Sequence, residues 1–494
     1  MDSNNGLATS FDVLIIGAGI SGINMAYRIQ TKVPQYNYSI LEARDAIGGT
    51  WDLFRYPGVR SDSDLHTFGF AWQPWKTSQT IADGESIRKY LNECAEDHGI
   101  DKKIRFRHKV LSANWLSGYQ KWILKVDADG KEMEFAARFV ILCTGYHNYD
   151  QPLQATIPGL QNFKGKVIHP QFWPADLDYT DKKIVIIGSG ATAVSLFPVL
   201  AKKASHVTIL QRSPTYILAM PAVDKTAMFL RRFLPFNFVA RLMRVKFLIL
   251  PFLFFCFCRA YPTMARSVLR ANSKAHLPKS FSADPHFKPK YNPWEQRLCL
   301  SPDGDFYAAL HRDNTEIVTD TIETITEDKI LTTEGKVLEP DIIVTATGLN
   351  LQLCGGASIT VDNEPVQPNS KLFWRGSMLQ DIPNSAFVIG YTNAAWTLGA
   401  DATAHLVCRI LKHMYDNRIS TVIPQISDAE RANIQVKPTL NLNSTYIENG
   451  RKMLPKSGNK LPWSFKRNFF IDRWHASWSD LNNGLKFFNN LKHE

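Results

Sequence analysis

The stretch VLIIGAGISG, residues 13–22, decides the fold of the first part of the chain. Its four apolar residues predict a buried parallel strand, and the glycine pattern after them is typical of a dinucleotide-binding turn. Glycines let the chain turn tightly and approach a pyrophosphate, while the next helix points its N-terminal N–H groups at the phosphates. The predicted contacts are Gly17, Gly19, Ser21 and Gly22.

A second copy of the pattern, IVIIGSGATA, occupies residues 184–193. It again follows a β-branched run and opens an alanine-containing helical stretch, which is the context that the motif requires. The predicted contacts here are Gly188, Ser189, Gly190, Ala191, Thr192, Ala193 and Val194. Two nucleotide sites on one chain indicate that electrons pass between two cofactors, and so predict a redox enzyme.

The residue after the second strand of each unit selects the ribose. In the first unit that residue is Glu42, which can accept from ribose hydroxyls and would repel a 2′-phosphate. FAD fits this site. In the second unit the sequence gives Gln211, Arg212 and Ser213 instead. Because Arg212 can hold a 2′-phosphate in a bidentate manner and Ser213 can donate to it, this site predicts NADPH.

The composition is that of a globular protein with an excess of basic residues. The chain has 494 residues and a formal net charge of +11. Nucleic-acid binding would need a concentrated basic stripe, which we do not expect outside one segment near residues 220–290. The seven cysteines form no CxxC pair and no zinc pattern, so we expect no metal site and a reducing cytoplasm. No leader is expected before the first strand.

The order of motifs predicts an α/β fold with two nested Rossmann-like domains and a helical insertion. Residues 1–148 form the first part of the FAD domain, and residues 149–340 form the NADPH domain with the insertion at about 220–290. Residues 341–494 return to the FAD domain. Buried runs ending in Thr-Gly, at 139–145 and 341–348, mark the two changes of domain, and the run 387–391 would complete the FAD unit.

The insertion contains an apolar run, residues 247–258, that is too short to span a bilayer. Basic residues flank it at Arg231, Arg232, Arg241, Arg244, Lys246 and Arg259. Two interpretations stay open: a helical subdomain that lines a substrate tunnel, and an amphipathic helix that makes peripheral contact with a membrane through residues 220–260. We expect the tunnel.

Two further motifs carry a resemblance to a known family. The linker FKGKVIHPQFWP, residues 163–174, resembles the FxGxxxHxxxWP signature of type I Baeyer–Villiger monooxygenases. The stretch GGTWDLFRYPGVRSD, residues 48–62, is similar to their longer fingerprint, GGxWxxxxYPGxxxD. The resemblance is strongest to the ethionamide-monooxygenase-like branch, where it also includes residues 291–300 and 391–397. It covers nearly the whole chain and is weakest in the insertion.

The resemblance implies a reaction and its central residues. Family members use NADPH, dioxygen and a C4a-peroxyflavin to convert ketones to esters or lactones, and some oxidise sulfides or thioamides. A peroxide that must stay anionic needs a permanent cation and a site closed to water. By resemblance Arg297 is that cation, and Asp62 pairs with it. Arginine suits this role because it does not deprotonate at working pH.

The resemblance also implies supporting residues. The stretch along FAD would consist of Thr50, Trp51, Asp52, Leu53, Phe54, Arg60, Ser61 and Asp62, and the backbone of Val110 would meet the adenine. In the linker, Gly165, His169 and Trp173 would form a hinge motif. We expect His169 to transfer no proton and to tie backbone to backbone with its ring, supporting a domain rotation.

Two other functions remain in competition. One is a flavin N- or S-monooxygenase without ketone chemistry, and the other is a non-catalytic FAD-bound redox sensor. Arg297, Asp62, Glu42 and Arg212 together argue against the sensor. The expected partners are a small ketone or sulfide and O2, with no nucleic acid. The physiological substrate and the oligomeric state do not follow from the sequence.

Overall fold

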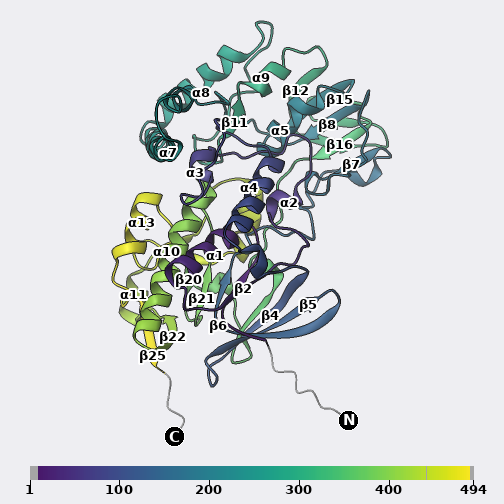
Figure 1. Cartoon of the computed structure of the whole chain (residues 1–494). Coiled ribbons are helices and arrows are strands. Elements are labelled where there is room, and N and C mark those ends of the chain that lie inside the picture. Colours follow the sequence, from purple (N-terminus) through teal and green to yellow (C-terminus); the bar gives the residue numbers. More distant parts are fainter. Residues whose placement is uncertain (1–8, 441, 490–494) are drawn as a thin grey trace.

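A computed structural model describes residues 9–440 and 442–489, and its first sheet carries the first nucleotide motif (Figure 1). Residues 1–8, where no leader is expected, lie outside the described part. The parallel half of the sheet runs in the order β3-β2-β1-β6-β21. Val13 pairs with Tyr38 on one side and with Phe139 on the other. These strands are β1 (Thr9–Ile16), β2 (Tyr38–Leu41), β3 (Ile104–Arg105), β6 (Lys131–Leu142) and β21 (Ser385–Phe387).

An antiparallel extension continues the same sheet. The strands β4 (His108–Leu116) and β5 (Lys121–Ala128) form a meander with the first half of β6. The later strands β17 (Ser358–Val361) and β18 (Glu364–Pro365) add to its edge. β17 and β21 come from the last third of the chain, so strands from that part of the chain complete the first sheet.

The second sheet carries the second nucleotide motif and is entirely parallel. Its order is β12-β9-β8-β16-β7. The strands are β7 (Lys166–Ile168), β8 (Lys183–Ile187), β9 (His206–Gln211), β12 (Thr315–Thr319) and β16 (Ile342–Thr345). The predicted nesting of two Rossmann-like units is confirmed, and Figure 1 shows the second unit above the first.

The predicted domain boundary at residue 341 is wrong by one strand. The strand β16 pairs with β7 and β8, so it belongs to the second sheet, and the return begins after Thr345. The error has a physical reason. A buried run that ends in Thr-Gly closes either unit equally well, and the sequence pattern does not say which sheet it joins.

Helices from both ends of the chain cover the first sheet. The helix α1 (Ile20–Lys32) packs against α10 (Trp396–Asp416), which also contacts α13 (Phe469–Trp478). Their apolar faces join β1 and β2 in one core cluster. The site also takes residues from α2 (Thr50–Leu53), α3 (Leu65–Phe68), α5 (Ala191–Leu200), α12 (Thr445–Gly450) and β11 (Cys299–Pro302). Beside them, α4 (Gly84–Asp97) packs against α2, and β10 (Ile217–Met220) pairs with β11.

The insertion is helical, as predicted. It forms α6 (Lys225–Leu230), α7 (Phe236–Ala260) and α8 (Pro262–His276). The apolar run 247–258 lies within α7, which continues through Pro251. Among the helices in the described ranges, none combines the length and apolar content needed to cross a bilayer.

Candidate active site

Both nucleotide motifs open into one cavity of about 1130 Å³. This volume lies just above the roughly 300–1,000 Å³ that is typical of a pocket for one small ligand. The predicted residues that line it are Gly17, Gly19, Ser21, Glu42, Thr50, Trp51, Phe54, Arg60, Asp62, Gly188, Ser189, Gly190, Ala191, Thr192, Arg212, Ser213, Arg297 and Val110. Two separate motifs therefore meet in one space.

The first motif leaves no room for a side chain at Gly17 or Gly22. Gly17 has a φ of +103°, and a Cβ there would lie 2.8 Å from the carbonyl oxygen of Cys143. A Cβ on Gly22 would lie 1.9 Å from the carbonyl oxygen of Gly17, so this glycine lets α1 approach the turn and does not itself line the cavity. The hydroxyl of Ser21 accepts a hydrogen bond from the indole of Trp396 at 2.8 Å.

Glu42 lies buried at the end of β2 and is fixed by the backbone. One carboxylate oxygen accepts from the amide of Ala18 at 2.6 Å, and the other accepts from the amide of Arg44 at 2.9 Å. Burial raises the pKa of Glu42, and the two amides lower it in part. A carboxylate has about four acceptor positions. Glu42 therefore keeps capacity for ribose hydroxyls on its cavity side.

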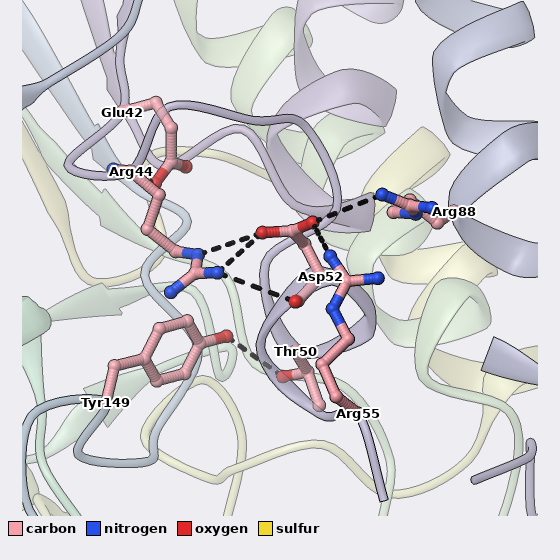
Figure 2. A network of polar contacts seen from close by, with 7 residues as sticks. All are labelled: Glu42, Arg44, Thr50, Asp52, Arg55, Arg88 and Tyr149. Carbon is pink, nitrogen blue, oxygen red and sulfur yellow. Dashed lines mark hydrogen bonds and ion pairs between the residues drawn. The ribbon is translucent and has the colours of Figure 1, made fainter. Parts of the chain in front are cut away.

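Asp52 anchors the segment that follows the glycine pair 48–49, as Figure 2 shows. Its buried carboxylate pairs with Arg44 at 2.6 Å, with Arg55 at 2.5 Å and with Arg88 at 3.8 Å. Asp52 and Leu53 do not line the cavity. The Asp52 side chain faces three arginines and holds α2 in place, while Thr50, Trp51 and Phe54 face the cavity.

The second motif repeats the tight turn. Gly188 has a φ of +134°, and a Cβ there would lie 2.3 Å from the carbonyl oxygen of Ala346. Ala193 and Val194 are buried in α5 and do not reach the cavity. The buried amide of Gln211 donates to the carbonyl of His286 and to the hydroxyl of Thr319, both at 2.9 Å. Ala193, Val194 and Gln211, which we expected to contact the cofactor, therefore lie buried next to the turn and do not line the cavity.

Arg212 lies exposed at the end of β9, beside the second turn. Its guanidinium donates to the hydroxyl of Thr445 at 3.2 Å. In residues 9–440 and 442–489, no carboxylate forms an ion pair with it. Next to it, the hydroxyl of Ser189 donates to the carbonyl of Ser213 at 2.7 Å. An exposed guanidinium with a neutral partner is chemically suited to a phosphate dianion.

Arg297 and Asp62 form an ion pair, although they are 235 residues apart in the chain. Their side chains are 32% and 37% exposed, and both line the cavity. The negative charge of Asp62 is the main cause of a raised pKa for Arg297. The neighbouring Arg60 pairs with Asp305, and the buried Ser61 does not line the cavity.

Aromatic and imidazole groups that the sequence analysis missed surround this ion pair. Tyr146 stacks on Trp396 with a centroid distance of 5.3 Å. Burial and the nearby Arg297 lower the pKa of His147 to about 3, so its imidazole is neutral at pH 7. Tyr446 of α12 lines the same space. Tyr146 and His147 could have been found, because they follow a strand that ends at the ligand edge of the sheet.

The linker motif lies outside the cavity. The Nε2 atom of His169 is 3.2 Å from the carbonyl oxygen of Gly348, and Nδ1 accepts from the amide of Gln171 at 3.3 Å. Both ring nitrogens of His169 therefore meet backbone groups. A Cβ on Gly165 would lie 2.6 Å from the carbonyl oxygen of Asp341, and Trp173 packs against Tyr179. The rotation that this motif would support remains a prediction.

The expectation that residues 247–258 line a substrate tunnel is wrong for this cavity. No described residue between Thr215 and Gln296 lines it. The inner side of α7 packs against α3, where Phe247 stacks on His66 with a centroid distance of 4.8 Å. Its outer side faces solvent.

Comparisons with known proteins agree with these features. The flavin-binding monooxygenase-like family model matches residues 75–245, and the NAD(P)-binding Rossmann-like domain model matches residues 15–82. The FAD-containing monooxygenase EthA of Mycolicibacterium smegmatis is 46% identical over 464 residues, which cover 94% of each chain. The chain belongs to the FAD-containing monooxygenases.

Other relatives extend this family assignment. The enzyme of the same name from Mycobacterium tuberculosis is 44% identical and covers 93% of this chain and 94% of its own. The probable FAD-binding monooxygenase AlmA of Acinetobacter baylyi is 42% identical and covers 94% and 93%. Membership in this family confirms the resemblance to the ethionamide-monooxygenase-like branch.

Solved structures show the same fold. A steroid monooxygenase bound to NADP has a TM-score of 0.75 at 21% identity and covers 98% of this chain and 100% of its own. Cyclohexanone monooxygenase from Rhodococcus sp. Phi1, bound to NADP⁺, has a TM-score of 0.74 at 20% identity and covers 98% and 100%. The two-domain α/β fold is therefore that of known monooxygenases.

Proposed function

We propose that the protein is a Baeyer–Villiger monooxygenase that converts ketones to esters or lactones and also oxidises sulfides or thioamides. The observation that carries this proposal is the pair of Arg297 and Asp62 facing a single cavity that both nucleotide motifs line. The overall reaction is balanced: a ketone, O2, NADPH and H⁺ give an ester, NADP⁺ and water.

The residues fit FAD at the first motif and NADPH at the second. The crowded turn at Gly17 and the fixed carboxylate of Glu42 suit a pyrophosphate and an adenosine ribose without a 2′-phosphate. The exposed Arg212 suits the 2′-phosphate of NADPH. When bound, FAD would accept hydride from NADPH and activate dioxygen.

In this mechanism Arg297 supplies a permanent positive charge to the oxygen that attacks the ketone carbonyl. Asp62 orients the guanidinium through their ion pair, and its negative charge raises the pKa of Arg297 further above its ordinary value. Preorganised charge of this kind is worth most in a site closed to water. Tyr146, Trp396 and the neutral His147 supply the walls that would limit water beside the charge.

The relatives are monooxygenases, which supports oxygenation, and the similar solved structures include a steroid monooxygenase and cyclohexanone monooxygenase. A screen of NADPH consumption over ketones of graded chain length, with product identification, tests the proposal. Formation of an ester supports it. NADPH-dependent oxidation of a simple sulfide, with no ester from any ketone, would favour the competing flavin N- or S-monooxygenase.

We infer that the enzyme works in a reducing cytoplasm, because its seven cysteines are free thiols and six of them are buried. Its partners would be a small ketone or sulfide, O2 and the two dinucleotides. Peripheral contact with a membrane through residues 220–260 is a separate matter, because that surface lies outside the cavity.

A further inference from the structure

The outer side of α6 and α7 is apolar. The exposed side chains there are Phe229, Phe233, Phe238, Leu242, Val245, Ile249, Leu250 and Leu253, which together form what we call the outer face. They are 42–71% exposed. Along α7 they recur every three or four residues, which places them on one side of the helix. A surface helix in a globular protein usually shows the opposite arrangement.

Two of the four cations on α7, Arg244 and Lys246, point into the protein. Arg244 donates to the carbonyl oxygens of His66 at 2.9 Å and Gly69 at 2.8 Å. Lys246 pairs with Asp224 at 2.5 Å. These bonds fix the rotation of α7 about its axis. The outer face is therefore held outward, because turning it inward would bring these cations into solvent and break three polar contacts.

A second apolar element adjoins the outer face. The ring of Phe252 on α7 meets that of Phe470 on α13 edge to face, with a centroid distance of 5.3 Å. The same side of α13 exposes Trp474 and Trp478, with 57% and 76% of their surface accessible. Figure 1 shows α7 and α13 along the same flank of the molecule. Exposed tryptophans are typical of the boundary between membrane and water.

The positive charge around the outer face favours an anionic lipid surface over a second copy of the chain as its partner. Residues 225–283 contain eleven lysines and arginines and no aspartate or glutamate. Arg232, Arg241 and Arg259 are exposed around the outer face. A symmetric contact with a second copy would bring the same patch against itself, and with it like charges. An anionic lipid surface offers both the apolar layer and the complementary charge.

We propose that this enzyme docks peripherally on an anionic membrane. The outer face and the tryptophans of α13 enter the headgroup region, and the three exposed arginines contact lipid phosphates. No helix among the described residues is suited to crossing the bilayer, so the contact is a surface one. On the inner side of α7, the ring of Phe255 packs edge to face against that of Trp294, with a centroid distance of 5.5 Å. This contact joins the docking helix to the loop that carries Arg297.

Co-sedimentation with vesicles tests the proposal on the FAD-loaded enzyme. The vesicles are phosphatidylcholine alone or phosphatidylcholine with about one third phosphatidylglycerol, each at low and high salt. We expect binding to the anionic vesicles that weakens as salt screens the arginines. Replacing Arg232 or Arg241 by Gln should weaken binding roughly fivefold per arginine. Equal pelleting with both lipids at all salt concentrations would overturn the charge argument.

A matched pair of variants tests the apolar contact. Ile249 on the outer face and Leu111 on β4 are both 42% exposed. Ile249→Glu should lower the partition onto anionic vesicles by on the order of tenfold or more, because a charge replaces an inserted side chain. Leu111→Glu should leave it unchanged. Equal binding by Ile249→Glu and the wild type would overturn the proposal.

Two controls separate docking from folding and from dimerisation. The FAD content and the NADPH oxidation rate of Ile249→Glu should equal those of the wild type. Sedimentation velocity without lipid should show the same mass for both proteins. If the wild type fails to bind vesicles and forms a dimer that Ile249→Glu abolishes, then the outer face is a protein interface and the membrane proposal is wrong.

Discussion

The two nucleotide motifs share one strand–turn–helix design and differ at the ribose position. At the first motif, Glu42 is buried and held by two backbone amides. At the second motif, Arg212 is exposed and held by a single threonine hydroxyl. A rigid buried acceptor suits a cofactor that stays bound, and an exposed cation suits one that is exchanged in each turnover. The difference predicts which cofactor is resident.

The largest effect is expected at Arg297, which lines the cavity that both nucleotide motifs share. Arg297→Ala should lower the rate of ester formation by about 10²–10³-fold, the usual cost of removing a preorganised charge from a reacting oxygen. FAD binding and NADPH oxidation should persist. Ester and NADPH are measured in the same reaction.

Arg107→Ala is the control for this variant, because Arg107 is 60% exposed and its one ion pair among the described residues is with Asp129 on the surface. It should behave like the wild type. Normal ester yield from Arg297→Ala would show that Arg297 is not the partner of the attacking oxygen.

The resident site is tested through its buried acceptor. Glu42→Ala removes the partner of two backbone amides and of the ribose, and should lower FAD affinity by about 1–3 kcal/mol, roughly 5–150-fold. Glu42→Gln keeps one acceptor oxygen and should lose less. The measurement is the FAD content after gel filtration, followed by titration of the apoprotein. Full FAD occupancy in dilute Glu42→Ala would contradict the assignment of this site.

The exchange site is tested through its exposed cation. Arg212→Ala should weaken NADPH binding by about 1–3 kcal/mol and leave NADH binding unchanged, because only NADPH carries the 2′-phosphate. Thr445→Ala removes the neutral partner of Arg212 and serves as the matched control, with little expected loss. Steady-state kinetics with both nucleotides give the answer. Equal use of NADPH and NADH by the wild type would contradict the assignment of Arg212 to the 2′-phosphate.

The smallest expected effect concerns His147 between the two sites. Its pKa is lowered to about 3 in the folded protein, below the ordinary value of 6.5. The unfolded chain therefore binds the proton first as the pH falls, so this group lowers the free energy of unfolding below pH 6.5, by at most about 1.4 kcal/mol per pH unit down to pH 3.

His147→Asn removes this contribution. Its free energy of unfolding should fall less than that of the wild type between pH 7.5 and 5.5, by about 1 kcal/mol, as measured with urea. Identical pH dependence in the two proteins would show that the imidazole is not held neutral.

The sequence was sufficient for features that depend on short-range patterns. The strand before each glycine turn and the positions of Glu42 and Arg212 at the ends of β2 and β9 follow local rules of spacing. The pairing of Arg297 with Asp62 spans 235 residues, and only resemblance to a family pointed to it. A contact at that separation leaves no periodicity in the sequence.

Two expectations were wrong because a sequence pattern does not say which sheet a strand joins or which side of a helix faces solvent. The run before Thr345 could belong to either sheet, since both sheets bury the same residue types. The arginines near residues 231–259 could point in or out, and the carbonyls that Arg244 reaches, at His66 and Gly69, come from a distant segment. The apolar run was therefore assigned to a tunnel, although much of it faces solvent.

A crystal structure of the chain with FAD and NADP⁺ tests the central claim most directly. We expect FAD at the first motif, with its adenosine ribose at Glu42, and NADP⁺ at the second, with its 2′-phosphate within hydrogen-bond distance of Arg212. Either dinucleotide at the opposite motif, or a 2′-phosphate away from Arg212, would contradict the account.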